Sequence, residues 1–196
     1  MADEAGVGRL LVASLHQGIA DVLPTRLEFY ESWLNPSGLR DGRIGLAPMA
    51  AVLSFLRIEG EPYGFVTERA GEYTAEWSVS EMSGFHRAVL TRAPPAIRAR
   101  LVLRYASTMI RSTYGGSRVV VRWRKGKATV DIRGSIFCEV REPVASPLCG
   151  FYVAAITRLM RLFQLDAEVT MDHCRATKDA TGCVMALRVT PAGAQA

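Results

Sequence analysis

The stretch Pro147-Leu148-Cys149-Gly150-Phe151-Tyr152, together with the residues that follow it to about Val189, decides the fold. Apolar side chains recur every three or four positions after Pro147, which predicts an amphipathic helix to about Leu165. Its buried face is expected to carry Tyr152, Ile156, Leu159 and Phe163. The stretches 167–172 and 183–190 alternate in polarity and predict two strands. Strands adjacent along the chain favour an antiparallel sheet, with the helix packed on it.

Upstream of this segment, the apolar periodicity predicts helices over about 8–22, 24–34, 48–58, 62–80 and 95–110. The inward faces of the last two are expected to carry Val66, Ala70, Tyr73 and Trp77, and Ile97, Leu101, Tyr105 and Met109. The stretches 117–123 and 127–134, joined by Lys125-Gly126, predict a β-hairpin, and 136–140 is interpreted as a further strand. The predicted fold class is therefore α+β, with helices packed on a small twisted antiparallel sheet.

The length of 196 residues predicts one domain over 1–196, with a core of about 8–190 and a disordered tail over 191–196. No stretch is apolar enough to predict a membrane span. The acidic start, Met-Ala-Asp-Glu, lacks the pattern of a secretory signal, so we expect a cytoplasmic protein with reduced cysteines. The net charge of +5 favours solubility or an acidic partner.

The C-terminal segment is similar to the ending of 4-vinyl reductase domains. The shared features are a helix that opens at Leu148-Cys149-Gly150, a turn with Cys174-Arg175-Ala176 and Asp179, and a last strand that bears Cys183. The same superfamily, a ligand-binding fold of nitric oxide signalling and Golgi transport, contains the small subunits of the TRAPP vesicle-tethering complex. Their last helix begins with a comparable Leu-Cys-Gly.

This resemblance implies a metal site. In some aromatic-sensing members, three cysteines and a carboxylate bind zinc beside the ligand pocket. Carried over to this chain, the cysteines are Cys149, Cys174 and Cys183, and the carboxylate is Asp172, with His173 as a substitute. The alternative is that the cysteines are buried small residues without a metal.

The resemblance also implies a cavity for a small hydrophobic or planar ligand. Candidate lining residues are the aromatic and methionine side chains on or near the predicted inner helix faces, which are Tyr73, Trp77, Phe85, Tyr105, Met109, Phe151 and Tyr152. At helical spacing, a filled core is the alternative interpretation.

The function that follows is reversible binding of such a ligand by a sensor, carrier or delivery protein. One alternative is a TRAPP-like interaction module with a filled core, and a second is an accessory protein or reductase of tetrapyrrole metabolism. No catalytic constellation accompanies His16, His86 or His173, so an enzyme is the less favoured reading. Relatives often pair through their early helices, which implies a homodimer through about 8–34. The arginines near the hairpin are interpreted as a solvated strand face, and no nucleic-acid partner is expected.

Overall fold

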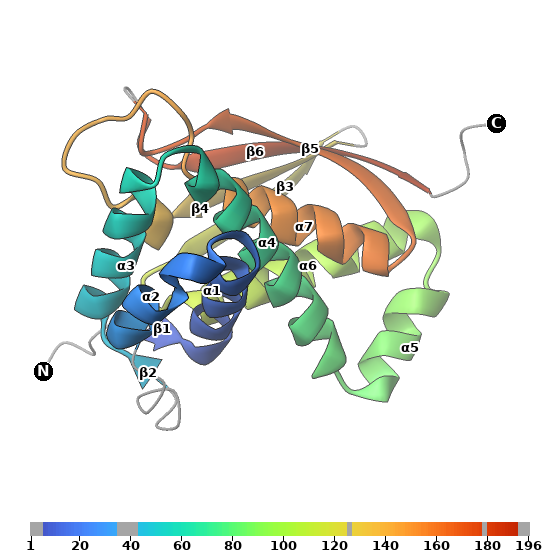
Figure 1. The fold of residues 1–196 in the computed structure, drawn as a ribbon. Helices are drawn as coiled ribbons and strands as arrows, with labels where there is room; N and C mark the ends of the chain where they lie inside the picture. The colour runs from blue at the N-terminus through green and yellow to red at the C-terminus, as the bar shows by residue number, and fades with distance from the viewer. Residues whose placement is uncertain (1–5, 35–42, 125–126, 178–179, 192–196) are drawn as a thin grey trace, which may run out of the picture.

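The computed structural model describes residues 6–34, 43–124, 127–177 and 180–191. The chain begins with a helical part and ends with a part rich in strands (Figure 1). The elements, in order, are β1 (Val7–Gly8), α1 (Arg9–Val22), η1 (Pro24–Arg26), α2 (Leu27–Leu34), β2 (Arg43–Ile44), α3 (Leu46–Ile58), α4 (Glu61–Ser80), α5 (Gly84–Arg92), α6 (Pro95–Thr113), β3 (Arg118–Arg124), β4 (Lys127–Arg133), η2 (Ile136–Cys138), α7 (Gly150–Leu162), β5 (Leu165–His173) and β6 (Cys183–Pro191).

The main sheet has the strand order β3-β4-β6-β5, and every neighbouring pair is antiparallel. This confirms the predicted α+β class and the hairpin of β3 and β4. Strand β4 buries Ala128, Val130 and Ile132 on one face, as the alternation of side chains in a strand requires. Helix α7 packs against β5 and helix α6 against β3, so the helices cover one face of the sheet.

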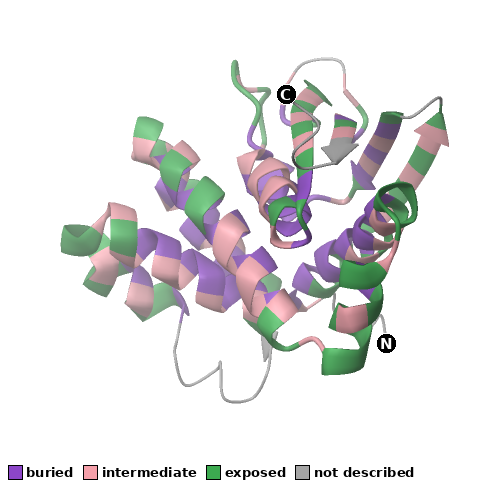
Figure 2. Ribbon diagram, turned by 90° about the vertical axis from the view of Figure 1, so that its right-hand side faces the viewer, coloured by how far each residue is buried: buried purple, intermediate pink, exposed green. Residues whose placement is uncertain are grey.

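Helix α4 lies between α1 and α7, and small residues let the three approach closely. A Cβ atom on Gly18 of α1 would lie 2.7 Å from the Val66 carbonyl oxygen of α4. A Cβ atom on Gly71 of α4 would lie 2.3 Å from the Phe151 carbonyl oxygen of α7. Figure 2 shows the buried sides of the helices turned toward the interior. Neither glycine can therefore gain a side chain without moving a backbone.

Two predicted inward faces differ from the structure. Val66 and Ala70 are buried as predicted. Most of the buried face of α4 consists of small residues, and the full set is Tyr63, Val66, Thr67, Ala70, Gly71, Thr74, Ala75 and Ser78. Tyr73 and Trp77 are only half-buried beside that face. In α6, Ile97 is exposed and the buried face turns toward Val102, Leu103, Ala106 and Ile110. Helix α5 was not predicted.

The predicted strand over 136–140 was wrong, because the chain turns away from the sheet after β4. Gly134 has a φ of 70°, a conformation that favours glycine, and η2 follows as one 3₁₀ turn. Helix α7 buries the predicted Tyr152, Ile156, Leu159 and Phe163. Strand β6 extends to Pro191, the first residue of the expected tail. Residues 192–196 and the predicted turn at 125–126 lie outside the described residues. None of the described helices is long and apolar enough to cross a membrane.

Candidate metal centre

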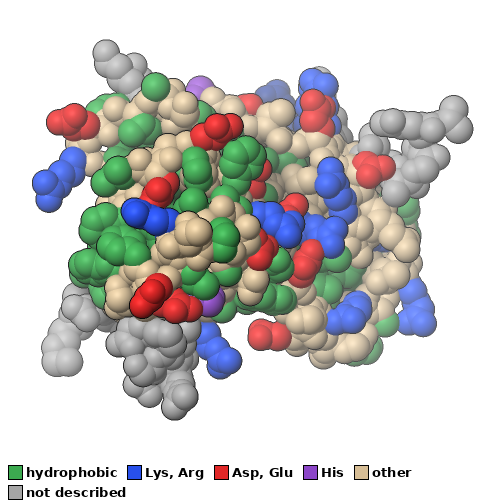
Figure 3. Space-filling model, in the orientation of Figure 1, with side chains coloured by type: hydrophobic (Ala, Val, Ile, Leu, Met, Phe, Trp, Pro, Cys, Tyr) green, Lys and Arg blue, Asp and Glu red, His purple; other side chains and the backbone are tan. Residues whose placement is uncertain are grey.

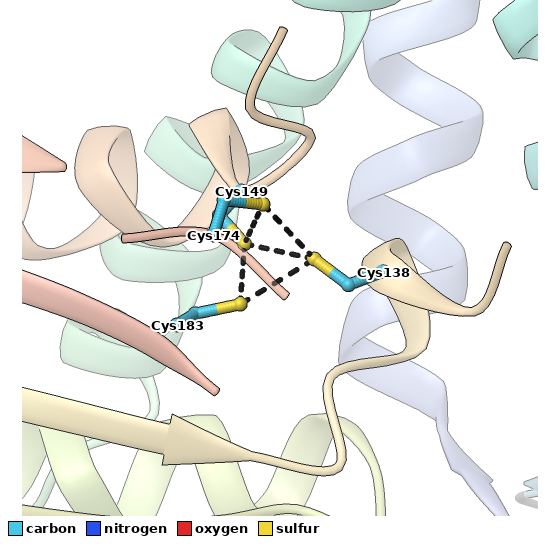
Figure 4. A group of neighbouring side chains, drawn as sticks. All are labelled: Cys138, Cys149, Cys174 and Cys183. Carbon is cyan, nitrogen blue, oxygen red and sulfur yellow. Dashed lines mark hydrogen bonds between the residues drawn. The ribbon is translucent and has the colours of Figure 1, made fainter. Parts of the chain in front are cut away.

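All four cysteines of the sequence meet at one buried point (Figure 4). Cys138 ends η2, Cys149 precedes the first residue of α7, Cys174 follows the last residue of β5, and Cys183 begins β6. Each side chain is at most 2% exposed, and none is in a disulfide. Four segments that are far apart in the sequence therefore each contribute one sulfur to the same small volume.

The sulfur atoms are spaced closely enough for one metal ion. The Sγ atom of Cys138 lies 2.9 Å from that of Cys149, 3.5 Å from that of Cys174 and 3.4 Å from that of Cys183. The Cys149 Sγ atom lies 3.4 Å from that of Cys174 and 2.8 Å from that of Cys183, and all four sulfurs lie within 4.8 Å of one another. A tetrahedron with zinc–sulfur bonds of about 2.3 Å has edges of about 3.8 Å, so the closest sulfurs need to move apart by about 1 Å to hold one Zn²⁺.

Hydrogen bonds fix the segment before α7, which carries Cys149, and the segment after β5, which carries Cys174. The Leu148 amide donates to Cys174 Sγ at 3.4 Å, which joins the start of α7 to the end of β5. The amide and hydroxyl of Thr177 both donate to the Cys174 carbonyl, at 3.0 and 2.7 Å. The Val144 amide donates to the Ala176 carbonyl at 2.8 Å. A hydrogen bond to a ligating sulfur also orients it toward the metal.

The electrostatics of the cluster favour a bound cation. Hydrogen bonds from the three neighbouring thiols and from the Leu148 amide lower the pKa of Cys174. Its neighbours, followed by burial, raise the pKa of Cys149. The hydrogen bond with Cys149 also lowers the pKa of Cys138. Four thiolates together would nevertheless place like charges in a buried site. A divalent cation removes that cost, because metal binding favours the deprotonated ligands.

The helical part reaches the cluster through two polar side chains. The Arg57 Nη2 atom of α3 donates to the Phe137 carbonyl at 3.0 Å, beside Cys138. The Tyr63 hydroxyl of α4 donates to the Leu148 carbonyl at 3.1 Å, beside Cys149. Burial raises the pKa of Tyr63, so this hydroxyl stays protonated and acts as a donor. Arg57 brings a positive charge to the surroundings of the sulfurs.

The structure brings together three of the four predicted metal ligands, Cys149, Cys174 and Cys183. Asp172 and His173 are exposed at the end of β5, and the fourth sulfur belongs to Cys138 instead. Cys138 was missed because a strand was predicted over 136–140 and because the resemblance supplied a carboxylate. The signal that points to Cys138 is simple: the chain has four cysteines, and a closed zinc site takes four ligands.

The predicted ligand-binding residues do not meet in one cavity. Tyr73 and Trp77 stack on each other at 5.2 Å on the side of α4, and the Tyr73 hydroxyl donates to Asp21 at 2.7 Å. Phe85 is 76% exposed on α5. Phe151 and Tyr152 lie in the filled core. Tyr105 and Met109 line a surface groove.

The core pair packs tightly beside the metal centre. The Phe151 ring stacks on that of Phe137 with 4.6 Å between centroids, and the Tyr152 ring meets Phe137 edge-on at 5.5 Å. The Tyr152 hydroxyl is buried and has no hydrogen-bond partner among the described residues. These two aromatic residues therefore fill space rather than line an open cavity.

The chain matches no protein-family model, and no curated protein matches its sequence. Solved structures do resemble it. The H-NOX protein of S. oneidensis in its Fe(II)NO ligation state has a TM-score of 0.61 and 10% identity, over 93% of this chain and 99% of that chain. The unliganded Fe(II) H-NOX protein of K. algicida has a TM-score of 0.57 and 12% identity, over 93% and 96%.

A third similar structure is that of a trafficking protein particle complex subunit. Subunit 3 of the trafficking protein particle complex from Naegleria fowleri, covalently bound to palmitic acid, has a TM-score of 0.50 and 12% identity, over 92% of this chain and 97% of that chain. At these identities the likeness shows the fold alone. This chain therefore shares the α+β fold of H-NOX proteins and of a TRAPP subunit.

Proposed function

We propose that this chain is a small-ligand-binding sensor or carrier domain whose strand-rich end is held together by one zinc ion. The observation that carries the metal part is the meeting of four buried sulfurs from four segments within 4.8 Å. Cys138, Cys149, Cys174 and Cys183 would hold the ion. Bound there, Zn²⁺ supplies structural cross-linking, because a site with four protein thiolates keeps no open position for a substrate.

The chain's own residues support this role. The Leu148 amide orients the Cys174 sulfur, and the Arg57 guanidinium offsets part of the negative charge of four thiolates. Tyr63 ties the loop before α7 to α4. Iron(II) is the rival occupant, because tetrahedral four-sulfur sites suit both metals. Metal analysis tells the two apart directly.

The ligand-binding part rests on the fold. The similar structures include an H-NOX protein in an Fe(II)NO state and a TRAPP subunit covalently bound to palmitic acid. All four cysteines of this chain lie in the metal centre, so none remains to attach a fatty acid through sulfur. We therefore propose reversible binding, of the hydrophobic or planar ligand class that the 4-vinyl reductase resemblance implies.

The metal part is tested by measuring zinc and iron in protein purified without chelators. We expect one zinc per chain in the wild type and none in Cys138→Ala or Cys174→Ala. Asp172→Asn is the matched control and should keep its zinc, because Asp172 is exposed. A wild-type protein that takes up no metal after zinc is added would refute the site. Loss of zinc in Asp172→Asn would indicate that the Asp172 carboxylate, and not Cys138, is the fourth ligand.

The ligand part is tested by native mass spectrometry of the same wild-type sample. We expect an added small organic mass that disappears on denaturation, or stabilisation by members of a panel of apolar compounds. A folded, zinc-loaded protein that carries no such mass and responds to no compound would contradict ligand binding and leave the metal site intact.

An interaction module is the second candidate, favoured by exposed aromatic residues on α2 and α3. Phe29 and Trp33 are 42% and 40% exposed, and both rings contact Phe55, at 5.3 and 5.4 Å. Hydrophobic side chains gather on this side of the molecule (Figure 3). The expected homodimer through 8–34 would bury this cluster. Light scattering should show a dimer that Phe29→Ser with Trp33→Ser converts to a monomer; a wild-type monomer at all concentrations would exclude it.

A further inference from the structure

A surface groove lies where α1, α4, α5 and α6 come together. Its volume is about 370 Å³, within the range of sites for small molecules. Leu10, Glu81, Met82, His86, Tyr105 and Met109 are among its lining residues. The groove is therefore large enough for a compact organic molecule.

The floor of the groove is apolar and adaptable. Met109 is almost fully buried beneath it, and Leu10 and Met82 are half-buried at its sides. Methionine side chains adjust their shape to the molecule they contact and make favourable contacts with aromatic rings. The floor therefore suits an aromatic body.

The polar groups of the groove favour a cation. Among the described residues that line it, Glu81 carries the only full charge, and none is lysine or arginine. Glu81 has no ion pair or hydrogen-bonded side chain among the described residues, so its carboxylate is free to receive a ligand. It also stands at the C-terminal end of α4, where the helix dipole favours positive charge.

Two further side chains are already held in place around this carboxylate. The Tyr105 hydroxyl donates to the Ser78 carbonyl at 2.8 Å, which leaves its oxygen able to accept a hydrogen bond. Burial raises the pKa of Tyr105, and the negative charge of Glu81 raises it further, so the hydroxyl stays neutral. The His86 ring is hydrogen-bonded to the Ser83 hydroxyl at 2.9 Å. The groove thus combines one free carboxylate with a preplaced phenolic oxygen that can accept a hydrogen bond.

We propose that this groove binds a small aromatic amine, with its ammonium group at Glu81 and Tyr105 and its ring on Met82 and Met109. This inference rests on the ligand-binding half of the proposed function and names the ligand class. An ammonium group donates several hydrogen bonds and pairs with a carboxylate, whereas an anion or a neutral alcohol gains little there.

The test is isothermal titration of the zinc-loaded full chain with 2-phenylethylamine, and with 2-phenylethanol and 3-phenylpropionate as probes of similar size. We expect the amine to bind at least tenfold more tightly than either of the others. Glu81→Gln should weaken amine binding by tenfold or more. Thr108→Trp, at an exposed position on the lining, should abolish it by filling the groove.

Glu68→Gln is the matched control, since it removes an exposed carboxylate from the same helix but outside the groove. Amine binding should be unchanged in that variant. Equal binding of amine and alcohol, or an unaltered affinity in Glu81→Gln, would overturn the proposal. Absence of amine binding by a folded chain with one zinc would also overturn it, yet would leave the proposed metal site untouched. If a folded, zinc-loaded chain binds no amine but carries a copurified ligand at another place, the proposed ligand-binding function is retained and only the groove proposal is overturned.

Discussion

Around the cysteines, four short segments meet with little regular structure, whereas α1, α4 and α7 lie against one another as regular helices. The first region depends on chemical donors, since its four buried sulfurs approach as closely as 2.8 Å. The second depends on the absence of side chains, since Gly18 and Gly71 let backbones touch. The cysteine region should therefore lose stability when its proposed cation is removed. The helical region should lose stability when a Cβ atom is added to one of its glycines.

The largest effect is expected from breaking the metal centre. Structural zinc contributes on the order of 10 kcal/mol of binding free energy, comparable to the whole stability of a domain. In Cys174→Ala, or in the wild type after strong chelation, amides of β5, β6 and the loop before α7 should lose protection in hydrogen exchange before those of α1 and α4. Zinc should restore the wild type but not the variant. Simultaneous loss across both regions would show that they are not separate.

The next effect should come from the helical contact. In Gly71→Ala the new Cβ atom would lie 2.3 Å from the Phe151 carbonyl oxygen, and we expect a loss of about 2 kcal/mol or more in unfolding free energy. Gly64→Ala in the same helix is the matched control, because nothing lies within 4 Å of its new atom. That change should stabilise by about 0.5–1 kcal/mol through helix propensity. Urea unfolding measures both, and equal effects would disprove close packing at Gly71.

A smaller effect should follow from loosening the contact between the two regions. Tyr63→Phe removes the hydroxyl that holds the Leu148 carbonyl and should cost about 1 kcal/mol, together with a loss of about tenfold or more in zinc affinity. Tyr30→Phe removes a part-buried tyrosine hydroxyl that donates to Glu59 at 3.0 Å and contacts none of the described cysteine-bearing segments. It should cost similar stability and leave zinc affinity unchanged in a chelator competition. A shared loss of affinity would mean that stability alone controls the metal.

The smallest effect concerns Asp21, at the outer side of the α1–α4 contact. Hydrogen bonds from Tyr73 and Gln17, followed by the charge of Arg69, lower the pKa of Asp21 below its ordinary 3.8. A lowered pKa adds stability that is present above the ordinary value and is lost as the pH falls through the folded value. Because the site is largely exposed to solvent, about 0.5 kcal/mol is expected. The difference in unfolding free energy between wild type and Asp21→Asn should shrink below about pH 4; a constant difference would exclude the ionic part.

The sequence predicted the region with strong periodicity better than the region with small residues. The buried face of α7 was confirmed because large apolar side chains mark it. The buried face of α4 was confirmed only at Val66 and Ala70. The rest was missed because Gly71, Thr74 and Ala75 carry no hydrophobic signal, while Tyr73 and Trp77 do. Close packing is decided by the partner helix, which a single helix's pattern does not contain.

The cysteine cluster was predicted in part for a related reason. Cys149, Cys174 and Cys183 belong to a recognisable C-terminal pattern, whereas Cys138 lies in a stretch that resembles a strand. Its position depends on the turn at Gly134, which takes η2 out of the sheet and toward α7. Of the groove at Glu81, the sequence predicted only Tyr105 and Met109, because four helices supply its walls.

The order of the cysteines along the chain has a consequence for biogenesis. Cys183, the last donor, comes 45 residues after Cys138, and it begins the strand that pairs with both β4 and β5. On a ribosome, the helices and the first hairpin emerge while the inner edge of β4 is still open and the metal site still incomplete. Zinc supply would thus act as a late quality checkpoint. In a zinc-starved cell, the nascent product would carry finished helices and an unpaired strand edge, the form most exposed to aggregation and degradation.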